Sequence, residues 1–224
     1  MKNKKILIMV AHPDDEIIGC GGTIAKINKY NEIMCVFYSD GESSRGKIDK
    51  KKILNRKKNA SEASSFLNIN KPIFLNYKDN QLDRYPLLSI IKKTEKIINS
   101  FKPDIIFTHY YDDLNIDHQI VSNAVITASR PVLKKNLEKI YMMEIMSSTN
   151  LNLNPKKSFF PNIYINITNN IEHKKKCLKI YKNEMMQYPN IRTIKSILNL
   201  NAHRGAEISK KYAESFILIR EIIN

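Results

Sequence analysis

Short apolar runs alternate with helical patterns through about the first 130 residues of the chain. Continuous apolar runs, typical of strands buried on both faces of a parallel sheet, predict strands at 5–10, 32–39, 72–75 and 104–108. Residues with helical apolar spacing predict the intervening helices at 19–30, 49–67, 87–101 and 117–128. This alternation favours βαβ units in a doubly wound α/β fold with a mostly parallel sheet.

The alternation loosens beyond about residue 139. The pattern there predicts strands at 139–145, 163–167 and 216–219, and helices at 172–186 and 191–200. We therefore expect a more irregular, mixed C-terminal part. No internal repeat or low-complexity linker divides the chain, so residues 1–224 are expected to form a single domain.

Composition places the chain among ordinary globular proteins. Of its 224 residues, 42% are hydrophobic and 26% are charged, which excludes disordered and collagen-like classes. The net charge of +15 comes from basic residues scattered along the chain. The scatter favours a solvated basic surface over a nucleic-acid stripe, and a basic protein can also prefer anionic ligands.

Compartment and membrane association follow from two simple observations. The longest apolar run, Ile6–Ala11, is far shorter than the roughly 20 residues that span a bilayer, and it ends in acids that no export signal carries. The three cysteines form no C-x-x-C motif, which argues against a disulfide framework. We expect a cytoplasmic protein without a transmembrane segment.

Two polar clusters follow directly after predicted strands. The first is His-Pro-Asp-Asp-Glu at 12–16, and the second runs from Thr108 to His118. Because the carboxyl ends of parallel strands share one edge of a sheet, the two clusters are expected to meet in one pocket. His12, Asp15 and His118 would then give two imidazoles and one carboxylate, a set that suits catalytic Zn²⁺ or Fe²⁺. Asp14 would be free to act as general base on water.

Structural explanations stand beside this hypothesis. Acids at the first cluster also suit a helix N-terminus, where they interact favourably with the helix dipole. His118 could be a structural histidine, with Asp117 capping the following helix. Gly19-Cys20-Gly21-Gly22 lacks the third glycine of a dinucleotide loop and is interpreted as close packing of the first helix.

The sequence Ala-His-Pro-Asp-Asp-Glu at 11–16, with Asp-His at 117–118, resembles the PIG-L/LmbE-like family of zinc-dependent N-acetyl-sugar deacetylases. Weaker similarities occur at Arg56 and in the segments 77–83, 159–162, 203–205 and 212–216. The resemblance covers nearly the whole chain. It implies a Rossmann-like three-layer fold and removal of acetyl from an N-acetylglucosamine-type amino sugar.

The resemblance also implies roles for individual residues. By position, His12, Asp15 and His118 match the metal ligands, and Asp14 matches the general base. Asp117 matches an acid that orients its neighbours. Arg56 matches a substrate-contacting arginine.

The chain departs from the family pattern at Asn115, where members commonly have a histidine that stabilises the oxyanion. An amide can donate a hydrogen bond to an oxyanion but cannot carry a proton as imidazolium does. Proton return to the leaving amine would therefore fall to Asp14. His109 and Tyr110 are further candidate donors to the substrate, and Asp79 is a candidate contact. Structural roles are equally open for these three.

The carrier of the acetylated sugar stays open at this stage. The positive charge favours an anionic small molecule or glycoconjugate, such as a nucleotide sugar or a surface-polysaccharide precursor. N-acetylglucosaminyl malate, a precursor of low-molecular-weight thiols, is the alternative substrate within the class. A non-catalytic protein that binds nucleic acid or sugar is the alternative of another class, although nucleic acid is not the expected partner. Whether the chain forms a homo-oligomer is also left open.

Overall fold

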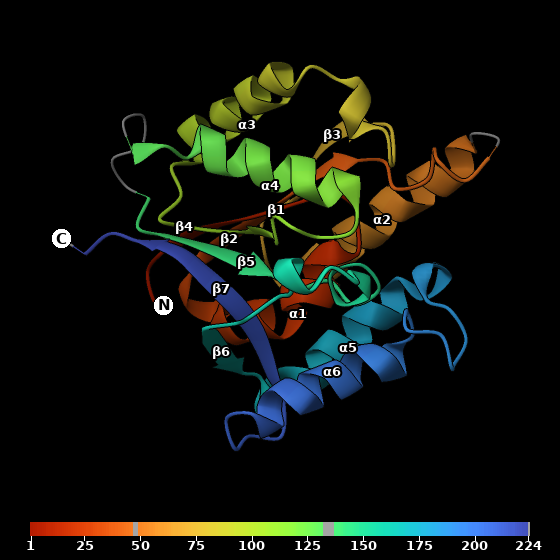
Figure 1. Ribbon diagram of the computed structural model, residues 1–224, viewed down its shortest axis with the longest axis vertical. Helices are drawn as coiled ribbons and strands as arrows, with labels where there is room; N and C mark the ends of the chain where they lie inside the picture. The colour runs from red at the N-terminus through yellow and green to blue at the C-terminus, as the bar shows by residue number, and fades with distance from the viewer. Residues whose placement is uncertain (47–48, 132–136, 224) are drawn as a thin grey trace.

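A seven-stranded sheet in the order β3-β2-β1-β4-β5-β7-β6 organises the molecule. The computed structural model describes residues 1–46, 49–131 and 137–223. Figure 1 shows α3 and α4 on one side of the sheet and α1, α5 and α6 on the other. The predicted α/β fold with three layers is confirmed.

Neighbouring strands β3, β2, β1, β4 and β5 pair in parallel, whereas β7 pairs antiparallel with both β5 and β6. The expected mixed C-terminal part is therefore the β7–β6 edge of the same sheet. The strands are β1 (Lys5–Val10), β2 (Glu32–Ser39), β3 (Ile73–Tyr77), β4 (Ile105–His109), β5 (Lys139–Met143), β6 (Ile163–Asn166) and β7 (Ala213–Glu221).

The helices at 50–66, 87–101 and 116–128 lie within one residue of their predicted bounds. The helix predicted at 172–186 ends at Ile180, and the helix predicted at 191–200 runs from Ile194 to Ala206. The helices are α1 (Asp15–Ile27), α2 (Lys50–Phe66), α3 (Leu87–Phe101), α4 (Ile116–Ala128), α5 (Ile171–Ile180) and α6 (Ile194–Ala206). None of the helices in the described residues is long and apolar enough to cross a membrane. All three cysteines are buried and unpaired.

Side chains of β1 alternate between two hydrophobic cores. Ile6 and Ile8 face the core on the side of α1 and α2, and Leu7 and Met9 face the core on the side of α3 and α4. Both sets are at most 2% exposed. Burial on both faces explains why this strand is a continuous apolar run, as expected for a central parallel strand.

Helix α1 begins at Asp15, four residues before the expected start at Gly19. Asp15 and Glu16 form its first turn, where negative charge is favourable, so the first cluster does lie at a helix N-terminus. Its glycines permit close packing, as predicted: a Cβ on Gly22 would lie 2.6 Å from Cδ1 of Ile167.

A buried ion pair joins α1 to α5 and β7. Helical geometry is interrupted at Cys20 (φ −143°, ψ 21°). Nζ of Lys174 donates to the carbonyl oxygen of Ile18 at 2.8 Å and contacts Oε1 of Glu214 at 2.7 Å. The Glu214 carboxylate accepts from the backbone N–H groups of Gly22 and Thr23. The backbone groups next to the break are thus satisfied by side chains from distant elements.

Candidate active site

The site lies between the carboxyl ends of β1 and β4. The chain leaves β1 toward α1 on one face and enters β4 from α3 on the other, so this is the position where the strand order reverses. The backbone N–H of Ala11 donates to Nε2 of His109 at 2.8 Å, which ties the two strand ends together. His118 lies in the first turn of α4. The two sequence clusters therefore meet, as expected.

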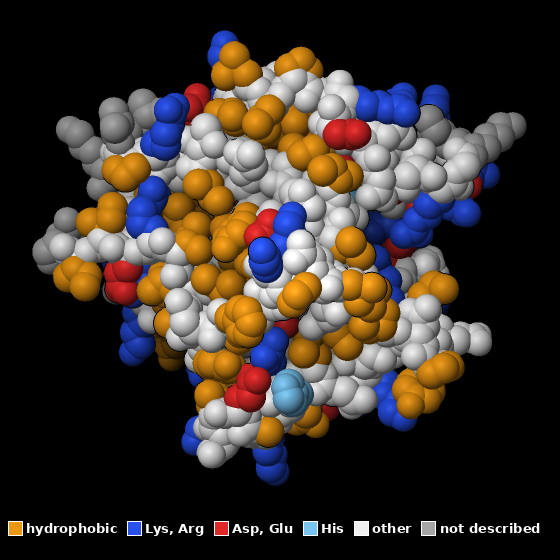
Figure 2. Space-filling model, in the orientation of Figure 1, with side chains coloured by type: hydrophobic (Ala, Val, Ile, Leu, Met, Phe, Trp, Pro, Cys, Tyr) orange, Lys and Arg blue, Asp and Glu red, His pale blue; other side chains and the backbone are white. Residues whose placement is uncertain are grey.

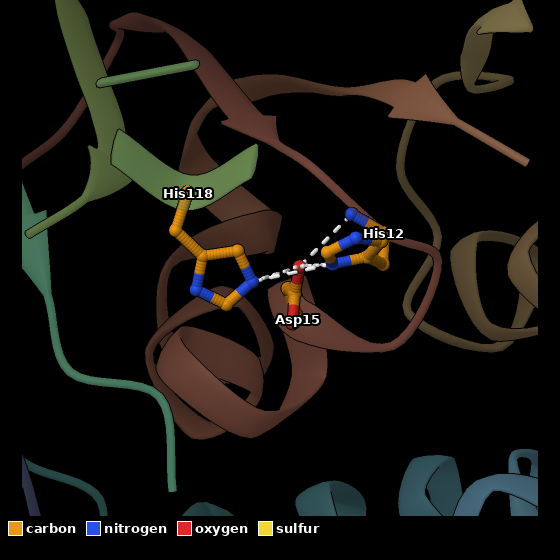
Figure 3. A group of neighbouring side chains, drawn as sticks. All are labelled: His12, Asp15 and His118. Carbon is orange, nitrogen blue, oxygen red and sulfur yellow. Dashed lines mark hydrogen bonds and ion pairs between the residues drawn. The ribbon is translucent and has the colours of Figure 1, made fainter. Parts of the chain in front are cut away.

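Three side chains converge on one point (Figure 3). Nδ1 of His12 lies 3.1 Å from Oδ2 of Asp15, and Nε2 of His118 lies 3.3 Å from the same oxygen. The two ring nitrogens are 3.2 Å apart. All three residues are buried, at 6%, 1% and 2% exposure.

This donor set fits a catalytic metal ion. Two ring nitrogens and a carboxylate oxygen are typical zinc ligands, and at bond lengths of about 2.0–2.1 Å tetrahedral ligands lie about 3.3–3.4 Å apart. The three distances among these atoms, 3.1, 3.2 and 3.3 Å, are close to that value. Three protein ligands would leave a fourth position open, as catalytic zinc sites do.

Each imidazole also has a carboxylate at its other nitrogen. Nε2 of His12 lies 3.1 Å from Oδ1 of Asp79 and 3.3 Å from Oδ2 of Asp117. Nδ1 of His118 lies 3.2 Å from Oδ1 of Asp113. Metal-binding histidines almost always donate their second nitrogen to such a partner, which fixes the tautomer and ring orientation. His12, Asp79 and Asp117 also form a close group, but they surround the outer nitrogen of His12.

The acids make this position favourable for positive charge. Burial alone would lower the pKa of His118, but Asp15 and Asp113 raise it to about 9. Burial would raise the pKa of Asp15, but His118 and His12 hold it well below its usual range. A cation at this point would replace the positive charge of the imidazolium rings. The electrostatics therefore agree with the donor geometry.

Asp14 lies at the N-cap of α1 with φ 136° and is fully buried. Its Oδ2 contacts Nη2 of Arg56 at 3.3 Å and Nη2 of Arg192 at 2.5 Å. Its Oδ1 is buried and has no hydrogen-bond partner in the part of the chain that the structure describes. One carboxylate oxygen is therefore held while the other is available as a proton acceptor.

Arg56 is held by many partners and is 2% exposed. Its guanidinium donates to the carbonyl oxygens of Pro13 and Gly41 and contacts the carboxylates of Glu42 and Glu184 at 3.0 and 2.7 Å. Gly41 has φ +70°, and a Cβ there would lie 2.5 Å from Nε of Arg56. Arg56 is thus held in a fixed position beside Asp14.

Asn115 and Asp117, at the start of α4, also lie close to the three converging side chains. Asn115 caps α4 by accepting from the N–H of Asp117, and its Nδ2 donates to Oδ1 of Asn80 at 3.1 Å. The Asp117 carboxylate accepts from the N–H groups of Asn80 and Leu82. Asp117 can therefore fix the His12 ring from a rigid position.

His109 and Tyr110 are placed differently. The His109 ring stacks on His118 with centroids 3.8 Å apart and is fully buried. Burial and neighbouring His118 lower its pKa, so the ring stays neutral. The hydroxyl of Tyr110 donates to the carbonyl oxygen of Ser158. Neither residue is among those that line the cavity.

A cavity of about 110 Å³ opens over the three converging side chains. Asp79 and Asn115 line it, and so do Arg45, Arg56 and Arg192, which come from three separate segments. Glu144, which directly follows β5, is not among the lining residues: its carboxylate contacts Nε of Arg204 at 2.7 Å and accepts from the hydroxyl of Ser215.

Sequence reasoning missed four polar residues of the site. Asp113 stood inside the second cluster without a role. Ser148 follows β5, and its Oγ lies 3.3 Å from Nδ1 of His118. Glu184 follows α5 and Arg192 precedes α6. No motif marked these three residues. Only the fold shows that these C-terminal segments close over the site.

Comparisons with known proteins agree with the fold and the motif. A family model for PIG-L, described as GlcNAc-PI de-N-acetylase, matches residues 7–129. An uncharacterized deacetylase of Escherichia coli strain K12, YaiS, is 30% identical over 137 residues, which is 58% of this chain and 71% of that protein.

Solved structures show the same fold over nearly the whole chain. N,N'-diacetylchitobiose deacetylase from Pyrococcus horikoshii has a TM-score of 0.78 at 23% identity, covering 97% of this chain and 84% of that one. GalB, the 4-carboxy-2-hydroxymuconate hydratase of Pseudomonas putida KT2440, has a TM-score of 0.77 at 16% identity, covering 99% and 98%. Because the two have different activities, the shared fold alone does not specify the reaction.

Proposed function

We propose, from the premise that this chain belongs to the PIG-L family of de-N-acetylases, that it hydrolyses the N-acetyl amide of an N-acetylglucosamine-type amino sugar. The products are acetate and the free amino sugar. As a member of that family the chain is a deacetylase hydrolase; the sugar, the metal and the individual roles below are the proposal.

One observation carries the proposal: a metal-fitting triangle of His12, Asp15 and His118 lies beside a buried carboxylate with one unpartnered oxygen. Zn²⁺ is the proposed ion, and Fe²⁺ fits the same ligand types. When bound, such an ion supplies a Lewis acid that polarises a carbonyl and lowers the pKa of water to about 7.

Asp14 is the proposed acid–base group. Its Oδ1 accepts the proton of the attacking water, and the resulting carboxylic acid then donates that proton to the departing amine. The two arginines contact Oδ2, which leaves Oδ1 as the oxygen for both proton transfers. One residue can perform both transfers because the proton gained in the first is lost in the second.

Asn115 is the proposed donor to the oxyanion that forms as the amide carbon becomes tetrahedral. One hydrogen of its amide nitrogen is used by Oδ1 of Asn80, and the second remains available. Asp117 orients His12 in this scheme. Arg56 and Asp79 line the space for the sugar. His109 accepts from the N–H of Ala11, and Tyr110 donates to the carbonyl oxygen of Ser158, so both have structural roles in this scheme.

An anionic carrier of the sugar suits the basic protein, with its net charge of +15. Nucleotide-linked and malate-linked N-acetylglucosamine are the carriers we would test first, together with N,N'-diacetylchitobiose, the substrate named for the Pyrococcus horikoshii protein. The reduced, buried cysteines support action in the cytoplasm.

A nucleic-acid-binding role has less support. On the face drawn in Figure 2, Lys and Arg side chains are dispersed and do not form one continuous patch. Such a role would also leave the buried histidine–carboxylate cluster without a purpose, since buried ionisable groups are costly unless paired.

A substrate panel read by amine appearance and acetate release tests the proposal. Wild type is expected to release acetate and amine in equal amounts from at least one N-acetyl sugar. Asp14→Asn should lower kcat by about 10²–10⁴-fold because the base is lost. Asn has nearly the same shape as Asp, so the substitution removes the proton acceptor with little change in packing. Release of no amine from any acetylated sugar would contradict the proposal.

A further inference from the structure

Arg192 reaches the site from a segment that carries no recognised motif. It lies just before α6, and its backbone is fixed on both sides: its N–H donates to Oδ1 of Asn190, and its carbonyl accepts from the N–H of Met186, both at 2.8 Å. The segment thereby presents one guanidinium toward α1. Nothing in the reaction described above depends on this residue except through Asp14.

The contact between Arg192 and Asp14 is closer than the one made by Arg56. Nη2 of Arg192 lies 2.5 Å from Oδ2 of Asp14, whereas Nη2 of Arg56 lies 3.3 Å from that oxygen. Charge-assisted hydrogen bonds to a carboxylate fix its position as well as its charge. With Oδ2 held from two sides, Oδ1 is the oxygen left for proton transfer.

The two arginines differ in what else they do. Arg56 is 2% exposed at the side chain and also holds Pro13, Gly41, Glu42 and Glu184. Both arginines line the cavity, but the Arg192 side chain is 27% exposed, and its Nε is buried and has no hydrogen-bond partner among the described residues. Asp14 itself is not among the lining residues. Arg192 therefore contacts both the substrate space and the proposed base.

We propose that Arg192 is a positioning residue that holds Oδ2 of Asp14, so that Oδ1 faces the reacting water. The inference rests on the proposed function, because it assigns Arg192 a role through the proposed base. Its guanidinium acts only on the orientation of Asp14 and takes no proton itself, since arginine stays protonated.

A purely structural role would be to tether the segment before α6. That segment has another tether: Oγ of Ser196 donates to the carbonyl oxygen of Asn190 at 3.1 Å. Ser196→Ala therefore loosens the same segment without touching Asp14 and serves as the matched control. Arg192→Lys keeps the positive charge but loses the planar fork of donors.

The test measures kcat and KM for Arg192→Ala, Arg192→Lys and Ser196→Ala on the best N-acetyl sugar of the panel, with zinc content and thermal unfolding recorded for each. We expect kcat of Arg192→Ala to fall by about 10²-fold, as for a misplaced catalytic group, with KM changed much less. Arg192→Lys should recover part of the loss, and Ser196→Ala should resemble wild type. Guanidinium chloride, added at a concentration too low to unfold wild type, should raise the rate of Arg192→Ala because it supplies the missing guanidinium group.

Several results would overturn the inference. They are an unchanged or higher kcat in Arg192→Ala, an effect on KM alone, or an equal loss in Ser196→Ala. If Arg192→Ala does not fold, Arg192→Gln and Arg192→Lys replace it, and equal kcat in these two variants overturns the inference. Failure of wild type to release acetate would instead overturn the proposed function and this inference with it.

Discussion

Each imidazole of the site has its two nitrogens directed at different groups. One nitrogen of His12 and one of His118 face Asp15, and the other nitrogen of each faces an outer carboxylate, from Asp79 and Asp117 or from Asp113. The neighbours thus fix which nitrogen is free for a cation. The nitrogen of each histidine that would bind the metal is therefore set by carboxylates that would not themselves bind it.

Asp113 should control metal affinity through His118. Asp113→Asn weakens the acceptor at Nδ1 of His118, so zinc affinity is expected to fall by about 10–100-fold in competition with a chelator. Asp112→Asn is the matched control, because Asp112 pairs with Lys157 near the surface. Equal zinc affinities in the two variants would contradict the role of Asp113.

Asn115 has two functions that can be separated by substitution. Asn115→Ser keeps an N-cap for α4 but removes the amide donor, whereas Asn115→Ala removes both. Both should lose about 10²–10³-fold in kcat if the amide stabilises the oxyanion. Only Asn115→Ala should also lose about 1 kcal/mol of unfolding free energy. A normal kcat in Asn115→Ser would remove Asn115 from the mechanism.

Residue-scale sequence reasoning predicted the three side chains that the structure brings together, and Asp117 beside them, but not most of the residues that hold them. His12, Asp15 and His118 could be singled out because they follow strands that a parallel sheet brings together. Arg192 and Glu184 could not, because nothing local distinguishes them from surface charges. Their place in the site depends on contacts with Asp14 and Arg56, which lie more than 100 residues away along the chain.

At the scale of elements, α1 connects the site to the C-terminal half. Its first turn carries Asp15, and its interrupted backbone is held by Lys174 from α5 and Glu214 from β7. Lys174 and Glu214 are 0% and 1% exposed at the side chain. A buried pair of this kind contributes little net stability, but removing one partner leaves the other charge uncompensated.

Lys174→Met should therefore destabilise the fold by about 3–5 kcal/mol, measured by urea unfolding. Lys175→Met on the same helix should change the free energy of unfolding by less than about 0.5 kcal/mol, because Lys175 is 40% exposed and its ion pair with Glu172, at 3.8 Å, is long. A similar small change in both variants would show that the buried pair does not hold α1.

Apolar pattern predicted β1, β2 and α3 with their observed limits, because burial follows periodicity closely in these elements. The start of α1 and the first half of β7 were missed. Both contain polar residues that are buried only because partners exist elsewhere, such as Glu214 with Lys174 and Ser215 with Glu144. The break at Cys20 has no local signal, since Ile18 and Gly22 are satisfied from α5 and β7.

At the scale of the whole molecule, the sheet order explains why distant motifs cooperate. β1 and β4 are neighbours although their sequences lie about a hundred residues apart, and their carboxyl ends meet where the strand order reverses. The mixed C-terminal part was expected, but its antiparallel insertion of β7 between β5 and β6 was not. The chain between β6 and β7 contains α5 and α6, so no tight turn between the two strands signalled their pairing.

The central claim is that His12, Asp15 and His118 together hold a divalent cation. Anomalous diffraction from crystals grown with zinc, recorded on both sides of the zinc absorption edge, tests it most directly. The account predicts one strong peak within bonding distance of Nδ1 of His12, Oδ2 of Asp15 and Nε2 of His118, and its loss in His118→Ala. No peak among these atoms, or an undiminished peak in that variant, would contradict it.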